Sequence, residues 1–248
     1  MSLSENTRKL LTTIAEYLPR VKQQGYDVGY SQHEKDFWEE YMQEGRSTTG
    51  MFSGSGWTEE NFKPIRDFNV SQNTFYNHNV SNGNPYDLVE HLKKYNVKIT
   101  GVVNVRSAFY YAQFTHLPEL DISNGGSMLY QTFGGMKALH TIDKLIFNSE
   151  GTMTNSSGFQ NCQALKNIII EGVIGRTFSF SECPFTVESM KSIITHLKNY
   201  AGTSSEHAYT VTFKSTAFSA LAAEGATSPN GNTWAEYIDD LKWNLTLA

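Results

Sequence analysis

The chain has 248 residues, of which 39% are hydrophobic and 18% are charged, and its net charge is −5. Both fractions lie below the averages of soluble globular proteins, and polar residues and glycine make up the difference. This composition disfavours a helical bundle and suits strands, turns and polar loops. The sequence has no basic block and no apolar run long enough to span a bilayer, so we expect neither a nucleic-acid partner nor a membrane.

The N-terminal segment differs from the rest of the chain. Residues 1–44 are helix-like and acidic, and their apolar residues alternate at three and four positions, a spacing that suits a coiled-coil stem. Pro19 and a capping box that begins at Ser31 favour instead two separate helices, the second packed against the end of the repeats described next. Four glycines in residues 45–58 predict a linker, and no apolar secretion signal is visible at the N-terminus.

An aromatic residue followed by apolar residues three, six, nine and eleven positions later recurs along the chain. The clearest copy runs from Phe159 to Ile170. Other copies begin at Tyr111, at Phe133 with a short slip and at Phe180, and weaker copies begin at Phe52 and Phe75. One copy alone cannot bury its apolar residues, so we expect neighbouring copies to stack into a continuous core.

Short apolar strands within these copies predict the fold. The expected strands, in their spatial order, are 120–122, 145–147, 168–170, 211–213 and 245–247. In each strand the outer residues should face the core, and the middle residue should face solvent. Because connections between parallel strands are right-handed, the sequence predicts an α/β repeat fold, a right-handed solenoid with one parallel β-sheet.

Helices interrupt and close these repeats. Asn84 and Pro85 predict a helix start before the apolar residue Leu88. Residues 186–200 carry apolar residues at helical spacing, and Thr233 opens a capping box. The expected divisions are an N-terminal helical segment (1–44), degenerate repeats (45–185) and C-terminal capping repeats with helical crossovers (186–248).

The sequence lacks catalytic and metal-binding motifs. No nucleophile elbow, phosphate loop or zinc motif occurs, and the seven histidines are scattered, so each is interpreted as a surface or turn residue. Cys162 and Cys183 share one repeat position. Their role could be that of a nucleophile, a redox pair or buried side chains that fill the core, and the last is favoured. A glycan hydrolase would need two opposed carboxylates on the sheet, and only Asp121 is a candidate. We therefore expect no enzyme, no metal and no cofactor.

Residues 159–168, F-Q-N-C-Q-A-L-K-N-I, resemble the F-x-x-C-x-x-L-x-x-I/L unit of BspA-type leucine-rich repeats. The wider layout is similar to that of leucine-rich-repeat and phage tail-associated proteins of gut Firmicutes and their prophages, at residues 36–41, 56–64 and 243–248. The resemblance implies a leucine-rich-repeat solenoid that binds partners or builds structure, in a phage particle or at a bacterial cell surface. It supplies no catalytic residues.

Two functions are compatible with this reasoning. The first is a non-enzymatic interaction module whose sheet face binds a protein or a cell-surface glycan; the alternative is a structural spacer that forms homo-oligomers through its N-terminal helices. The candidate binding residues are Glu119, Asp121, Lys144, Ile146, Asn167, Ile169, Glu171 and Thr212. Ile146 and Ile169 would form an apolar patch beside charges, unless strand propensity alone explains them or another segment covers them.

Overall fold

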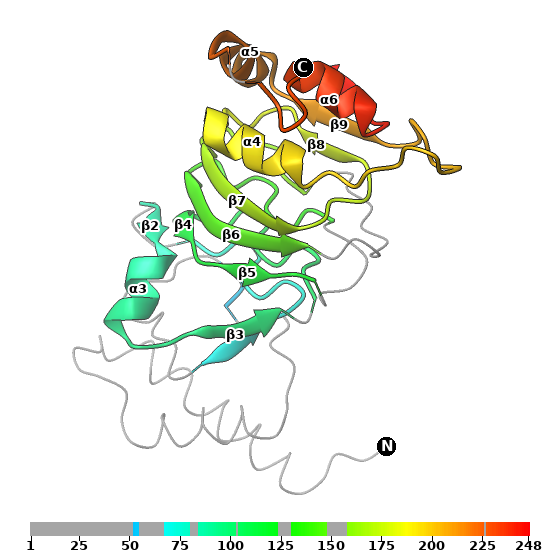
Figure 1. Ribbon diagram of the computed structural model, residues 1–248. Helices are drawn as coiled ribbons and strands as arrows, with labels where there is room; N and C mark the ends of the chain where they lie inside the picture. Colours follow the sequence, from blue (N-terminus) through cyan, green and yellow to red (C-terminus); the bar gives the residue numbers. More distant parts are fainter. Residues whose placement is uncertain are drawn as a thin grey trace, which may run out of the picture. The chain divides into compact units, whose positions relative to one another are not determined.

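The described part of the chain is an α/β fold in which the paired strands run parallel (Figure 1). The computed structural model describes residues 52–54, 67–79, 84–102, 104–123, 130–147, 158–225 and 227–248. The chain divides after residue 46, and every described residue belongs to the second part. The predicted helices and oligomer contacts of residues 1–44 therefore lie outside the described residues.

The described strands form three parallel sheets. In chain order the elements are β1 (Phe68–Val70), β2 (Tyr86–Asp87), α3 (Leu88–Lys94), β3 (Ile99–Val102), β4 (Phe114–Leu117), β5 (Leu120–Asp121), β6 (Thr141–Phe147), β7 (Asn167–Gly172), β8 (Phe178–Phe180), α4 (Val187–Thr195), β9 (Thr210–Phe213), α5 (Ser215–Ala223), α6 (Trp234–Asp240) and β10 (Asn244–Leu247). One sheet pairs β1 with β3, and another has the order β8-β9-β10. In the third, five-stranded sheet, β4, β5 and β7 all pair with β6, and β2 pairs with β4.

Helix α4 closes the outer edge of β7, as Figure 1 shows. The backbone N–H of Ile168 donates a hydrogen bond to Ser189 Oγ at 2.9 Å. Two residues along the strand, the N–H of Ile170 donates to Ser192 Oγ at 2.8 Å. Because these hydroxyls take the place of a further strand, the prediction of one continuous sheet is wrong. The strand β8, which the sequence did not predict, pairs with β9 in a separate sheet.

A row of phenylalanine rings, which we name the phenylalanine row, runs through the core. Successive ring centroids lie 5.0–5.9 Å apart. The row consists of Phe52, Phe75, Phe109, Phe133, Phe159, Phe180 and Phe213. Each of these side chains is at most 6% exposed. All the predicted copies but one therefore begin at a residue of this row.

The exception is the copy that was predicted to begin at Tyr111. Tyr111 is 45% exposed and has a φ of 58°, and Phe109 supplies the ring of the row. The pairing of Leu117 with Ile142 explains the error. The segment from Phe109 to Leu117 is one residue shorter than its counterpart in the next copy, the segment from Phe133 to Ile142. This deletion shifts the apparent frame of the copy, so its predicted start is wrong by two residues.

The C-terminal elements agree closely with the sequence. The strands β9 and β10 are parallel, and α5 and α6 lie between them in the chain. The capping box at Thr233 and Glu236 is confirmed, with each side chain bonded to the backbone of the other residue. The predicted helix 186–200 is shorter than expected, because α4 ends at Thr195. The short helix α5 was not predicted.

Helix α3 begins later than the sequence suggested. Its N-cap is Asp87, whose carboxylate accepts a hydrogen bond from the backbone N–H of Glu90 at 3.0 Å. The predicted cap at Asn84 is wrong because the chain first enters strand β2 and pairs with β4. Asp87 consequently joins the helix to the sheet.

Candidate functional site

The side chains of the five-stranded sheet that do not enter the core form a polar surface, which we name the outward sheet face. They alternate with buried residues along β5, β6 and β7. The surface comprises Asp87, His116, Glu119, Asp121, Thr141, Asp143, Lys144, Ile146, Asn167, Ile169 and Glu171. Seven of the eight candidate binding residues predicted from the sequence lie on this surface.

A lysine connects charges from neighbouring strands on this face. Lys144 Nζ on β6 lies 3.2 Å from Glu119 Oε2 and 3.0 Å from Glu171 Oε2. Hydrogen bonds to Glu171 and Glu119 raise the pKa of Lys144, which keeps the ammonium charged. Because both glutamates are exposed and Lys144 is only half-buried, the ion pairs contribute little stability. Their main effect is to fix the positions of three predicted binding residues.

A bulge in β6 shifts the register across the face. Asp143 and Lys144 together lie opposite the single residue Ile169 of β7. Ile146 consequently pairs with Glu171, so the predicted row that joins Ile146 directly to Ile169 is wrong. The extra residue accounts for the short slip in the copy that begins at Phe133, although no glycine or proline in β6 marks a bulge there.

The predicted apolar patch is centred on one isoleucine. Ile169 is 57% exposed, whereas Ile146 is half-buried and pairs with Asp121, as predicted. Thr212 is not part of this surface, because β9 belongs to the three-stranded sheet, where Thr212 pairs with Ser179. The candidate patch is therefore smaller than the sequence suggested and lies on β7.

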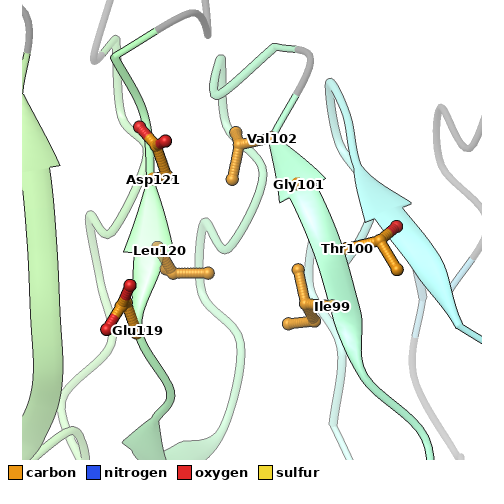
Figure 2. Close-up of a pocket in the computed structure, with 7 residues that line it drawn as sticks. All are labelled: Ile99, Thr100, Gly101, Val102, Glu119, Leu120 and Asp121. Carbon is orange, nitrogen blue, oxygen red and sulfur yellow. The ribbon is translucent and has the colours of Figure 1, made fainter.

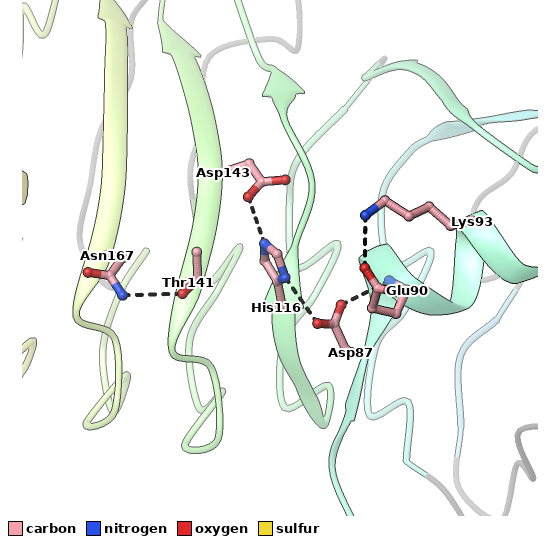
Figure 3. A network of polar contacts seen from close by, with 7 residues as sticks. All are labelled: Asp87, Glu90, Lys93, His116, Thr141, Asp143 and Asn167. Atoms are coloured by element: carbon pink, nitrogen blue, oxygen red, sulfur yellow. Dashed lines mark hydrogen bonds and ion pairs between the residues drawn. The ribbon is translucent and has the colours of Figure 1, made fainter.

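His116 lies between two carboxylates from neighbouring strands (Figure 3). Its Nδ1 is 3.1 Å from Asp87 Oδ2, and its Nε2 is 2.7 Å from Asp143 Oδ1. Burial lowers the pKa of His116, but the hydrogen bonds to Asp143 and Asp87 outweigh it and raise the pKa overall. The sequence reasoning missed this group, because the three residues are far apart in the chain and only the strand pairing brings them together.

This arrangement disfavours acid–base catalysis on the outward sheet face. Both ring nitrogens of His116 contact carboxylates, so neither is free to take a proton from a substrate. The adjacent polar residues bond to each other, since Asn167 Nδ2 donates to Thr141 Oγ1 at 3.4 Å (Figure 3). Among the described residues, no group of three histidine, cysteine or acidic side chains could hold a metal ion.

Two histidines that were predicted at the surface are buried, so the prediction is wrong for both. His78 is 0% exposed and His91 is 3% exposed. His78 Nδ1 lies 2.8 Å from the carbonyl oxygen of Phe52, and its Nε2 lies 2.7 Å from Tyr86 Oη. Burial lowers the pKa of His78 to about 4, so the ring is neutral. The signal was present in the sequence, since His78 occupies the repeat position of Cys162.

The prediction that both cysteines are buried is confirmed. Cys162 and Cys183 are free thiols with 0% exposure. Burial raises the pKa of Cys162 to about 12 and raises that of Cys183 as well. The thiol of Cys162 donates to the carbonyl oxygen of Phe133, 3.0 Å away. A nucleophilic role is disfavoured, because a thiol with a raised pKa forms little thiolate at neutral pH.

A shallow cavity of about 260 Å³ lies beside the outward sheet face, between β3 and β5 (Figure 2). It is lined by Ile99, Thr100, Gly101, Val102, Glu119, Leu120 and Asp121. The two strands belong to different sheets, because β3 pairs with β1 and β5 pairs with β6. The lining contributes two carboxylates and no cationic side chain, so the cavity extends the acidic character of the face.

Comparisons with known proteins give no assignment. No family model matches the chain, and no curated protein or solved structure matches it significantly. In the described part of the chain, no helix has the length and apolar character needed to cross a membrane. Fold and site together define an α/β protein of parallel strands with an exposed, acidic sheet face.

Proposed function

We propose that the described part is a right-handed leucine-rich-repeat solenoid of the BspA type. In this proposal it acts as an interaction module and not as an enzyme. The phenylalanine row supports this proposal, because its members recur in successive copies. A turn residue with positive φ, Gly54 after Phe52 being the first, also recurs two positions after five of these rings. The other four turn residues are Asn77, Tyr111, Gly135 and Asn161. Repeat proteins of this kind bind partners through an extended face.

The outward sheet face is the observation that carries this proposal. It presents five carboxylates, from Asp87, Glu119, Asp121, Asp143 and Glu171. Against them stand only Lys144 and His116, which pair with four of the five carboxylates, so the face keeps a net negative charge. We propose that the partner is a protein segment with lysine or arginine side chains, because complementary charge favours such a pair. The exposed side chain of Ile169 provides an apolar anchor beside the charges.

The biological setting is proposed from the resemblance alone. The F-x-x-C-x-x-L-x-x-I/L spacing of residues 159–168 supports a phage particle or a bacterial cell surface. The alternative function, a spacer that oligomerises through residues 1–44, concerns residues outside the described part and predicts no peptide binding.

An array of basic peptides, each with apolar residues, tests the proposed face. We expect the full chain to bind a subset of them, with binding that weakens as salt rises. Ile169→Lys and Glu171→Lys should each abolish this binding, because each adds positive charge to the face. Glu206→Lys is the control, since Glu206 is an exposed residue between α4 and β9. Absence of binding by the unchanged chain, or binding by either face variant as strong as that of the unchanged chain, would refute the proposed function.

A further inference from the structure

Four tyrosines cluster on turns that belong to the phenylalanine row. The tyrosine patch consists of Tyr76, Tyr110, Tyr111 and Tyr130. The ring centroids of Tyr76 and Tyr110 lie 5.6 Å apart, and those of Tyr110 and Tyr111 lie 4.3 Å apart. Three of the five large hydrophobic side chains that are exposed in the described part belong to this patch. A group of exposed aromatic rings indicates a binding surface more strongly than scattered exposed residues do.

The core holds the first two rings of the patch in place. Tyr76 and Tyr110 directly follow Phe75 and Phe109, whose rings stack in the phenylalanine row at 5.2 Å. The backbone N–H of Phe75 donates to the carbonyl oxygen of Ala108 at 2.7 Å, which joins the two turns. The two tyrosines therefore lie side by side because their turns do.

The ring of Tyr111 packs closely on a glycine of the next copy. Gly135 has a φ of 77°, and a Cβ at this position would collide with the ring of Tyr111. The equivalent position in the next copy is Asn161, which has a φ of 60°. The ring therefore packs against the backbone of Gly135, which limits the positions that it can take. Ordered rings lose less conformational entropy on binding.

The polar groups of the patch are uncharged, apart from one arginine. The hydrogen bond with Tyr111, burial and the neighbouring phenols raise the pKa of Tyr110 to about 12, so its hydroxyl stays neutral. Gln131 Nε2 donates to Tyr110 Oη at 3.4 Å. The guanidinium of Arg106 lies over the ring of Tyr130, 5.4 Å from its centroid. All the electrostatic neighbours that act on Tyr110 are phenols, in contrast to the carboxylates of the outward sheet face.

We propose that the tyrosine patch binds an uncharged polysaccharide. The C–H faces of sugar rings carry partial positive charge and stack on the electron-rich faces of aromatic rings. Sugar hydroxyls can exchange hydrogen bonds with the phenols and with Gln131, and neither side needs a charge. A protein partner is disfavoured, because a basic segment is better matched by the outward sheet face and the patch contains no aliphatic side chain. This site is separate from the proposed function of the sheet face.

Electrophoresis of the full chain in native gels that contain laminarin, hydroxyethylcellulose or galactomannan tests this proposal. At least one polysaccharide should retard the protein, and the double variant Tyr76→Gln, Tyr111→Asn should bind about tenfold more weakly. Both substitutions use residues that the chain carries at the same positions of a later copy, Gln160 and Asn161, so the turns should be retained.

Two controls separate this proposal from misfolding and from the sheet face. Tyr237→Gln on α6 removes a tyrosine outside the patch and should leave retardation unchanged. Ile169→Lys should also leave it unchanged, whether or not that variant loses peptide binding. Retardation by none of the three polysaccharides, equal retardation of the double variant, or binding of basic peptides at the patch would overturn the proposal.

Discussion

His78 occupies the repeat position that Cys162 fills in a later copy, and both side chains contact the carbonyl oxygen of a preceding row phenylalanine. His116, in contrast, lies at the surface between two carboxylates. The contributions of the two histidines to the stability of the fold therefore change with pH in opposite directions. For His78 burial favours the neutral ring, whereas for His116 the carboxylates favour the charged ring.

Acid should destabilise the fold through His78. Its pKa is lowered from 6.5 to about 4, so the unfolded chain binds a proton that the folded chain excludes between these values. The free energy of unfolding should fall as the pH falls through this window, by about 2 kcal/mol at pH 5. His78→Met, which copies the residue found at the equivalent position 136, should remove this part of the pH dependence. Urea unfolding at several pH values from 7.5 to 5 measures this pH dependence, and His140→Gln, at an exposed histidine, is the control. If the free energy of unfolding of His78→Met falls with pH as steeply as that of the unchanged chain, the account is contradicted.

His116 should stabilise the fold most at low pH. Because its folded-state pKa is raised, its contribution is complete below pH 6.5 and is lost as the pH rises through the folded-state value. His116→Gln should therefore cost more at pH 6 than at pH 9, by about 1 kcal/mol. The charged groups that act on the ring are Asp143 and Asp87. An NMR titration of the ring with a midpoint below 6.5 would contradict this explanation.

Helix α4 takes the place of a further strand at the edge of β7. Ser189 is 4% exposed, and its hydroxyl accepts the backbone N–H of Ile168, which would otherwise be buried without a partner. The same device recurs at Ser192. The pattern of apolar residues predicted helix α4 but not its capping of β7, because serine in a helix is normally expected to face solvent.

Removing the hydroxyl of Ser189 should weaken this edge. Ser189→Ala leaves the N–H of Ile168 unpaired and should cost about 1–3 kcal/mol of unfolding free energy. Hydrogen exchange at the amides of β7 should become faster, since the edge loses an acceptor. Ser219→Ala on α5 is the matched control, because Ser219 is exposed. If both variants unfold at the same urea concentration, the helix does not close the sheet in the way described.

The repeated aromatic positions predicted part of the arrangement of the described residues. The row residues Phe133, Phe159 and Phe180, and the parallel pairing of β5, β6 and β7, agree with the sequence. The rest required pairing information. The one-residue deletion after Phe109 and the bulge at Asp143 displace the apolar pattern, but only the strand pairing shows which residues then lie opposite one another. The capping of β7 by α4 leaves no trace in that pattern.

The candidate site was predicted in composition but not in arrangement. Glu119, Lys144 and Glu171 were named from strand alternation, and the structure brings them into contact. Strand alternation cannot show which residues of different strands lie opposite one another. The contacts of His116 with Asp87 and Asp143 therefore could not be predicted.

Hydrogen exchange of the full chain, with and without the tightest-binding basic peptide of the array, tests the central claim most directly. If the outward sheet face binds the partner, the peptide should slow exchange in β6 and β7, at residues 141–147 and 167–172. Protection confined to the turns at residues 72–77 and 106–111, or no change in β6 and β7 at saturating peptide, would contradict the account.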